Sequence, residues 1–375
     1  MKHTIFTPYR VCPLGAHVDH QLGQVTGFAI DRGVELEFDI TEDGTFDLIS
    51  KNYPGHIMFT LEDELEREML WGDFLKAAIV ALSRKYELRR GIKGVIEGTL
   101  PVGGLSSSAA VILTYLNAVC IANDIQITRP EIISNAIWAE RNYIGANVGK
   151  LDQSCEVYCR KNGLLFLDTL DDSNEIIPVS SNMNQFEILI VYGGKERQLA
   201  GSAYNTRVDE CKAAAYALQA YAGMDYGNYK DTYLRNVPIG VYLQYKDRLP
   251  ENWRKRAEHF YGERQRVKDG IKAWKKGDIE EFGQLMFQSG RCSIELYDTG
   301  SDNLRDLQDI FENTDGIYGG RFSGAGFNGS SIALINPDKK EEIADKVRKE
   351  YIKRHPNLEK DFAIYFVNTA DGIKL

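Results

Sequence analysis

Apolar and polar residues alternate along several stretches of the chain, a pattern typical of half-buried β-strands. The clearest case runs from Thr26 to Ile40, where Val34, Leu36 and Phe38 alternate with charged or polar neighbours. Further strands are predicted at residues 4–10, 94–99, 163–168, 186–192, 332–335 and 362–367.

Longer segments with helical spacing predict helices between these strands. The segment from Ala109 to Ala122 is apolar on nearly all sides, so we expect a central, buried helix. Other helices are expected at residues 61–68, 70–85, 137–143, within 193–218, over most of 220–300 and at 338–353. The order strand, helix, strand at 332–367 favours an α+β second domain with an antiparallel sheet.

Two glycine-rich stretches interrupt this pattern, at residues 101–110 and 319–330. In the first, Gly103 and Gly104 precede three serines that lead directly into the buried helix. A helix N-terminus presents unpaired N–H groups and a positive dipole end, and glycines let a ligand approach, so this is a candidate phosphate site. It is not the common P-loop, because no lysine follows the glycines. The alternative is a serine cap on a core helix.

A polar, turn-rich segment at residues 9–25 carries His17, Asp19 and His20. These three side chains could form a metal cluster, but a metal usually needs more ligands in definite geometry. A substrate-binding loop that uses them as hydrogen-bonding groups is favoured.

Glu140 and Asp152 lie twelve residues apart across a glycine-containing turn. Two carboxylates placed in this way suit two tasks, one holding a cation and one acting as a base. The alternative is a surface glutamate and a helix-capping aspartate.

Composition narrows the class of protein. A chain of 375 residues suits two domains or one large domain. The net charge of −9 argues against a nucleic-acid surface, and no apolar run is long enough to span a bilayer. The first residues lack the apolar core of a signal peptide, and the six cysteines are scattered, so we expect a cytoplasmic protein with reduced thiols.

Three motifs stand in one order, at residues 10–19, 104–110 and 323–327, and together they resemble the GHMP family of small-molecule kinases. The resemblance covers nearly the whole chain. It implies an α+β fold with two lobes: residues 1–180 similar to domain 2 of ribosomal protein S5, and residues 181–375 ferredoxin-like, with the active site between them. Asp152-Gln153 and the segment 201–207 are similar to the sugar-kinase branch. Residues 9–21, 256–260 and 321–327 resemble its galacturonate-specific members.

This resemblance assigns roles to individual residues. It implies that Asp152 accepts the proton of the anomeric hydroxyl, that Arg10 keeps this carboxylate ionised, and that Ser108 and Glu140 bind Mg²⁺. The residues implied to contact the sugar are Ala16, His17, Asp19, Gly149 and Tyr204. Those implied to contact ATP are Gly103, Gly104, Ser106, Ser107, Ser108, Gly324, Gly326 and Trp71, the last with Phe74 beside it.

Two departures from the family pattern bear on the substrate. The second motif is one residue shorter than usual, which leaves its phosphate contacts open. Galactose-specific members usually carry a glutamate where this chain has Ala16, facing the C6 hydroxyl. Against a C6 carboxylate a glutamate would place two like charges together, at a cost of several kcal/mol. Alanine therefore favours a uronic acid, with Lys150, Lys195 or Arg197 as the candidate cation.

The expected activity is the phosphorylation of the anomeric hydroxyl of D-galacturonate, with ATP and Mg²⁺. The alternatives are a kinase for galactose or a related pyranose, and a sensor that binds sugar and ATP without turnover. No nucleic-acid or membrane partner is expected, and we expect a monomer or weak dimer.

Overall fold

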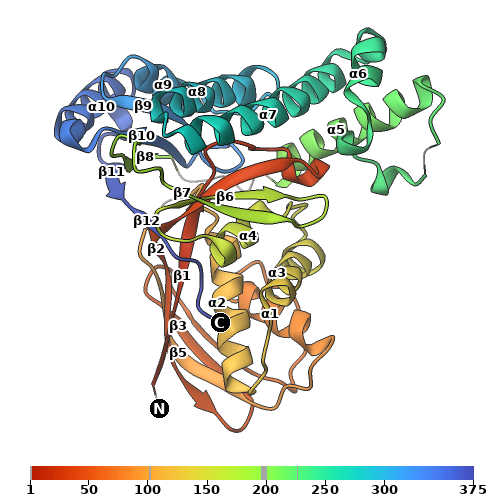
Figure 1. The fold of residues 1–375 in the computed structure, drawn as a ribbon. Coiled ribbons are helices and arrows are strands. Elements are labelled where there is room, and N and C mark those ends of the chain that lie inside the picture. Colours follow the sequence, from red (N-terminus) through yellow and green to blue (C-terminus); the bar gives the residue numbers. More distant parts are fainter. Residues whose placement is uncertain (1, 101–102, 196–200, 226) are drawn as a thin grey trace.

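The chain folds into two β-sheets with helices packed against them (Figure 1). The computed structural model describes residues 2–100, 103–195, 201–225 and 227–375. The first sheet contains β1 (His3–Val11), β2 (Gln24–Thr41), β3 (Thr45–Ser50), β4 (His56–Thr60), β5 (Gly91–Gly98), β6 (Gly163–Asp168), β7 (Asn174–Pro178) and β12 (Thr369–Ala370). Its order is β4-β3-β5-β2-β6-β7, and β1 and β12 also pair with β2.

The second sheet has the order β11-β8-β10-β9 and is antiparallel throughout, as the sequence predicted. Its strands are β8 (Glu187–Gly193), β9 (Ile317–Phe322), β10 (Ser330–Ile335) and β11 (Phe362–Val367). Pairing of β12 with β2 brings residues 369–370 back to the first sheet. The division of the chain at residue 180 stays a prediction.

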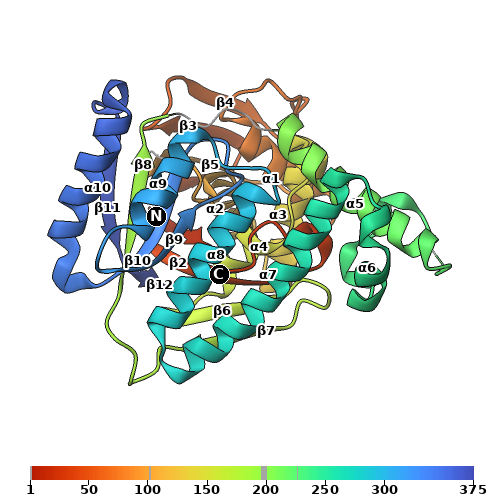
Figure 2. The ribbon, with the colours of Figure 1, turned by 90° about the horizontal axis from the view of Figure 1, so that it is seen from above.

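Helices α1 (Asp73–Ser83), α2 (Ser107–Ala122), α3 (Arg129–Trp138) and α4 (Leu151–Tyr158) pack together beside the first sheet. The other helices are α5 (Gly201–Tyr221), α6 (Ile239–Tyr245), α7 (Glu251–Lys276), α8 (Ile279–Glu295), α9 (Asp302–Glu312) and α10 (Lys340–Arg354). Figure 2 shows α5 and α6 on the side of the molecule opposite to α9 and α10. No helix in the described part of the chain is long and apolar enough to cross a membrane.

Helix α2 confirms the central helix that the sequence predicted. It packs against β1 and β2, and most of its side chains are buried, because its apolar residues occupy every face. The largest hydrophobic cluster contains α2 residues such as Leu113 together with Ile190 and Ile332 of the second sheet. One continuous core therefore fixes the two sheets relative to each other.

Two of the predictions from the sequence are wrong: one helix does not form, and one loop begins later than expected. Residues 61–68 form no helix; instead the N–H groups of Glu68 and Met69 donate to the Asp73 carboxylate, so the segment folds over the start of α1. The second glycine-rich loop begins only after Phe322, because Gly319 and Gly320 lie inside β9. A Cβ on Gly319 would come within 2.2 Å of the α8 backbone, so these glycines serve close packing of strand and helix.

Candidate active site

The Arg10 guanidinium and the Asp152 carboxylate form an ion pair at the junction of β1 and α4. Nε and Nη2 of Arg10 both donate to Oδ1 of Asp152, at 2.9 and 2.8 Å. Burial alone would lower the pKa of Arg10, but the charge and hydrogen bond of Asp152, together with the neighbouring Cys12 and Cys155, outweigh it and hold this pKa above its ordinary value. Oδ2 of Asp152 accepts no hydrogen bond within the described chain, and the side chain is 27% exposed. One oxygen therefore remains for a ligand.

Asp19 holds the start of the helix that carries Asp152. Its Oδ2 accepts a hydrogen bond from the N–H of Leu151 at 3.2 Å. A Cβ on Gly149 would come within 1.8 Å of the same oxygen, so only glycine leaves room for this contact. Burial, and then the charge of Asp152, raise the pKa of Asp19. The structure thus brings Asp19, Gly149 and Asp152 together, while their roles toward a sugar stay predictions.

The predicted phosphate loop enters α2 in a strained conformation. Ser106 precedes the helix with φ +64°, and its buried Oγ has no hydrogen-bond partner among the described residues. Ser107 and Ser108 form the first turn and are half-buried. An unsatisfied hydroxyl beside the first N–H groups of a helix fits an anionic ligand. Pro101 and Val102 lie outside the described residues.

This loop packs directly against the loop 323–329 from the other half of the chain. The Oγ of Ser330 donates to the carbonyl of Gly103 at 2.9 Å, and Nη1 of Arg10 lies 3.4 Å from both the carbonyl of Gly104 and the Oγ of Ser323. Gly104 and Gly324 both have positive φ, and a Cβ on either would press against the other loop. Gly326 also has a positive φ of +82° and packs on the ring of Phe322.

Glu140 lies in a π-helical turn, Ala139–Ile144, between α3 and α4. It is buried, and Nε2 of Gln153 donates to its Oε2. In the described ranges no group of three or more His, Cys, Asp or Glu side chains could hold a metal ion. A Mg²⁺ that binds with a nucleotide needs only one or two protein oxygens, so Ser108 and Glu140 have the donor chemistry for it.

Helix α7 holds the turn at residues 15–17. Oε1 of Glu263 accepts the N–H of Gly15 at 2.7 Å, and Nε2 of His259 donates to the carbonyl of Ala16 at 3.1 Å. The Ala16 side chain is buried. The position of the turn is therefore set by residues about 245 positions later in the chain.

A buried charge network supports this contact. Glu263 also accepts from Ser289 at 2.6 Å and from Nε of Arg266 at 2.7 Å, while Arg321 donates to Ser289 and to Ser293. Burial would raise the pKa of Glu263, but its cationic neighbours lower it to about 2. Sequence reasoning noted residues 256–260 and Arg321 only as similarities and missed Glu263, since partners far apart in the chain leave no local signal.

His17 and His20 make separate contacts and do not form the metal cluster considered as an alternative. Nε2 of His17 lies 3.0 Å from the carbonyl of Gly324; because a carbonyl only accepts, this nitrogen carries the hydrogen. The ring stacks on Tyr297 with centroids 4.6 Å apart, and burial lowers its pKa well below the ordinary value. His20 donates from Nε2 to the Tyr297 hydroxyl at 2.8 Å.

Tyr204 on α5 belongs to the same group of side chains. Its ring lies edge-on to that of His20, with centroids 6.0 Å apart. Burial first, and then the charges of Asp19 and Asp152, raise the pKa of Tyr204 well above its ordinary value. The hydroxyl is therefore a neutral donor beside two carboxylates.

The remaining candidates lie apart from this group or are committed to other partners. Trp71 is half-buried and donates from Nε1 to the carbonyl of Pro54, so its role toward a nucleotide stays a prediction. Lys150 pairs with Asp172 at 2.5 Å. Lys195 is half-buried, and Arg197 lies outside the described residues.

Glu156 is a buried carboxyl that sequence reasoning missed. It lies one turn after Asp152 on α4, is fully buried, and neither side-chain oxygen finds a hydrogen-bond partner in the described chain. Burial, and then the Asp152 charge, raise its pKa well above the ordinary value. Burial therefore favours the protonated, uncharged form of this carboxyl. The sequence did contain a signal for it. Glu156 stands four residues after Asp152, so the two carboxyl groups lie on the same face of the helix.

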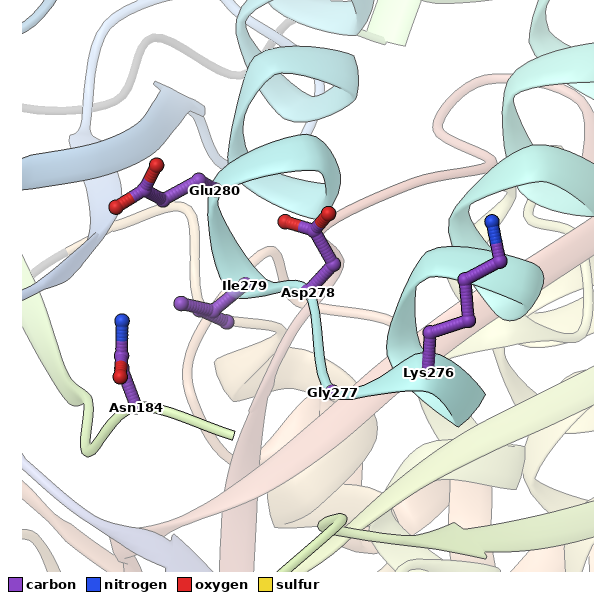
Figure 3. A pocket seen from close by; sticks show the side chains of 6 residues that line it. All are labelled: Asn184, Lys276, Gly277, Asp278, Ile279 and Glu280. Atoms are coloured by element: carbon purple, nitrogen blue, oxygen red, sulfur yellow. The ribbon is translucent and has the colours of Figure 1, made fainter. Parts of the chain in front are cut away.

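Two surface hollows share no lining residue with this site. The first, of about 400 Å³, lies at the start of α8 (Figure 3) and is lined by Asn184, Lys276, Gly277, Asp278, Ile279 and Glu280. Its Asp278 already accepts the N–H of Glu281 as the helix cap. The second, of about 570 Å³, lies between β8 and the end of β11.

Comparison with known proteins agrees with this geometry. Residues 73–160 match the GHMP kinases N terminal domain, and residues 271–353 match the GHMP kinases C terminal domain. The chain is 36% identical to a galacturonokinase of Arabidopsis thaliana, over 99% of this chain and 90% of the relative. It is 32% identical to a galactokinase of Thermococcus kodakarensis, over 98% and 99% of the two chains.

Solved structures give the same result. The galactokinase of Lactococcus lactis complexed with galactose superposes with a TM-score of 0.91 at 28% identity, over 100% of this chain and 95% of that one. The mevalonate kinase of Methanococcus jannaschii superposes with a TM-score of 0.67 at 17% identity, over 99% of both chains, and so shares the fold.

Proposed function

The chain belongs to the GHMP kinase family and is an ATP-dependent sugar kinase, and we propose that its acceptor is the anomeric hydroxyl of D-galacturonate. The choice of sugar rests on one observation: position 16 is an alanine, and its side chain is buried in the turn that α7 holds. The similarity to a galacturonokinase over nearly the full chain supports it independently.

The surroundings of Ala16 explain why a carboxylate there would matter. Its turn includes the neutral ring of His17 and is contacted by the ionised Glu263 and the neutral ring of His259. A glutamate at this position would add a second negative charge in a poorly solvated place, and a C6 carboxylate would meet it directly. Alanine leaves space for the C6 carboxylate of a uronic acid and places no repelling charge beside it. Lys195 stays a candidate partner, whereas Lys150 is already paired.

Asp152 is the proposed acceptor of the hydroxyl proton. Arg10 occupies Oδ1, so Oδ2 is the oxygen that can receive a hydrogen bond from the sugar. The same guanidinium lies beside the carbonyl of Gly104 in the phosphate loop, so its charge also faces the phosphoryl group in transfer. Phosphoryl transfer depends mainly on such positioning and charge neutralisation.

ATP is proposed to place its phosphates at residues 103–108, opposite Gly324. Mg²⁺, held by Ser108 and Glu140, would neutralise phosphate charge when bound. On the sugar side, Asp19 and Tyr204 offer an acceptor and a donor for ring hydroxyls, and the unpaired Nδ1 of His17 is a further acceptor in the described chain. We also infer a cytoplasmic enzyme, because all six cysteines are free thiols, and a monomer or weak dimer.

The test is a side-by-side measurement of kcat/KM for D-galacturonate and D-galactose with saturating ATP and Mg²⁺. We expect kcat/KM to be at least tenfold higher for galacturonate than for galactose. A tenfold ratio corresponds to about 1.4 kcal/mol, which is the smallest difference compatible with the charge argument. A tenfold preference for galactose would establish the second candidate, which the TM-score of 0.91 to a galactokinase favours. Binding of sugar and ATP without any sugar-dependent release of ADP would indicate a sensor.

A further inference from the structure

The segment that follows β11 leaves the second sheet, passes the end of α4, the helix that carries Asp152, and finishes beside α2 (Figure 1). The N–H of Asp31 donates to the carbonyl of Asn368 at 3.0 Å, and β12 then pairs with β2 through Thr369 and Ala370. Residues 369–374 are called the α4 strap below.

The α4 strap satisfies carbonyl groups at the far end of α4. The N–H of Ile373 donates to the carbonyl of Glu156 at 2.8 Å, and the N–H of Gly372 donates to the carbonyl of Cys159 at 2.9 Å. The last carbonyls of a helix have no partner within it, so these two bonds close the C-terminal end of α4.

Further contacts fix the strap itself. Oδ1 of Asp371 accepts the N–H of Lys161 at 3.0 Å, and Nδ2 of Asn117 on α2 donates to the carbonyl of Lys374 at 2.9 Å. The Ile373 side chain is 3% exposed and belongs to the main hydrophobic cluster. The strap is therefore held between α2 and α4 by packing as well as by hydrogen bonds.

Helix α4 needs such support, because an eight-residue helix is not stable by itself. At its start the Asp19 carboxylate holds the N–H of Leu151, and at its end the strap holds its carbonyls. The strap also reaches the partner of Asp152. Ala29 of β2 pairs with Arg10 on one side and with Ala370 on the other.

We propose that the α4 strap consists of positioning residues, which fix α4 and β2 so that Asp152 and Arg10 meet at hydrogen-bond distance. This assignment rests on the proposed function, since it gives the strap a role in the same phosphoryl transfer. None of the strap residues needs to contact a substrate for this role.

Gly372→Ala is the sharpest test. A Cβ there would come within 2.5 Å of the Val157 carbonyl oxygen and 2.9 Å of that of Glu156, and both are backbone atoms that no rotamer change can move. We expect kcat to fall by about tenfold to 10²-fold, because small misplacements at a reacting centre have effects of that size. KM for ATP and for sugar should stay within about twofold, since the binding groups are not touched.

Gly240→Ala is the matched control. Gly240 lies in α6, and a Cβ there meets nothing within 4 Å, so kcat should not change. The second measurement is hydrogen–deuterium exchange of the whole protein without substrates. In the Gly372→Ala variant the amides of α4 (151–158) should exchange faster, whereas those of α3 (129–138) should not.

The two proposals fail in different ways. The positioning role of the α4 strap is excluded if kcat of Gly372→Ala is unchanged, or if only the melting temperature falls while kcat per folded molecule stays the same. Should Gly372→Ala not fold, Asp371→Ala removes only the bond to Lys161, and the same two measurements decide. If the unmodified protein phosphorylates no sugar, the proposed function fails, while the exchange measurement still tests whether the strap fixes α4.

Discussion

Gly104 and Gly324 lie back to back, 220 residues apart in the chain: a Cβ on Gly324 would come within 3.1 Å of the Cα of Gly104. A Cβ on Gly104 would in turn reach 2.9 Å from the carbonyl oxygen of Ser323. The two glycine-rich motifs are therefore two halves of one surface, and each needs the other to lack a side chain.

Gly104→Ala should weaken nucleotide binding. The change adds strain at φ +97° and pushes the phosphate loop away from residues 323–324, so KM for ATP should rise by about tenfold or more. Gly223→Ala is the control, because Gly223 also has a positive φ, +63°, but a Cβ there meets nothing within 4 Å. Equal kinetics for the two variants would show that the contact between the loops is unimportant.

Asp152→Ala should remove most turnover and leave sugar binding largely intact. The loss of a base at the reacting hydroxyl lowers the rate by about 10²–10⁴-fold. Asp152→Asn retains an acceptor for Arg10 and should fold at least as well, with a similar loss of kcat. Single-turnover kinetics and calorimetric binding of the sugar are the measurements. A variant with kcat near that of the unmodified enzyme would exclude the proposed role.

Ala16→Glu should reverse the preference between galacturonate and galactose. Like charges in a buried contact cost several kcal/mol, so kcat/KM for galacturonate should fall by about 10²-fold or more. Ala16→Gln has almost the same size without the charge and should impair galacturonate far less. If both variants lose galacturonate activity equally, the effect is steric and the charge argument is wrong.

Glu156→Gln should make the protein more stable at alkaline pH. The folded state raises the pKa of Glu156 above its usual 4.5, so the unfolded chain releases this proton first. The stabilisation is complete below about pH 4.5 and is lost as the pH rises through the folded-state pKa. Urea denaturation at pH 5 and pH 8 should show a larger gain for the variant at pH 8 than at pH 5. The exposed Glu258→Gln serves as control.

The buried histidines should make the protein labile to acid. Burial is the main cause that lowers the pKa of His259 to about 4 and that of His20 to about 3. The unfolded chain binds these protons near pH 6.5, so stability should fall as the pH drops from about 6.5 to 4, by up to about 3 kcal/mol for His259. His20→Gln should flatten this dependence in urea melts. A curve for the unmodified protein that is already flat over this range would contradict the prediction.

Local pattern was sufficient for most elements and for the motifs. The continuous apolar surface of residues 109–122 predicted α2, and alternation predicted β2. The acidic run at 61–68 gave a wrong prediction. Its residues favour a helix, but hydrogen bonds to Asp73 and Lys76 outweigh this preference. These partners become available only once α1 has folded.

Some residues of the candidate site were likewise predicted from the sequence, and others were found only in the structure. Asp152, Asp19 and Gly149 were predicted from the sequence, and the structure brings them together. Glu263, Glu156 and the α4 strap were not predicted. Glutamate is common on exposed helix faces, and a short stretch such as 369–374 has no pattern of its own.

The sequence by itself determined the type of enzyme, an ATP-dependent sugar kinase. It also predicted the residues that we propose for the chemistry: two glycine loops for phosphate, a carboxylate for the hydroxyl, and an alanine where a charge would repel a uronic acid. Only the tertiary structure decided how these groups are held. Contacts such as Gly15 with Glu263, Gly104 with Gly324 and Ile373 with α4 join residues more than 200 positions apart. Their energies depend on burial and on distances of a few ångströms, which exist only after the core has closed around them.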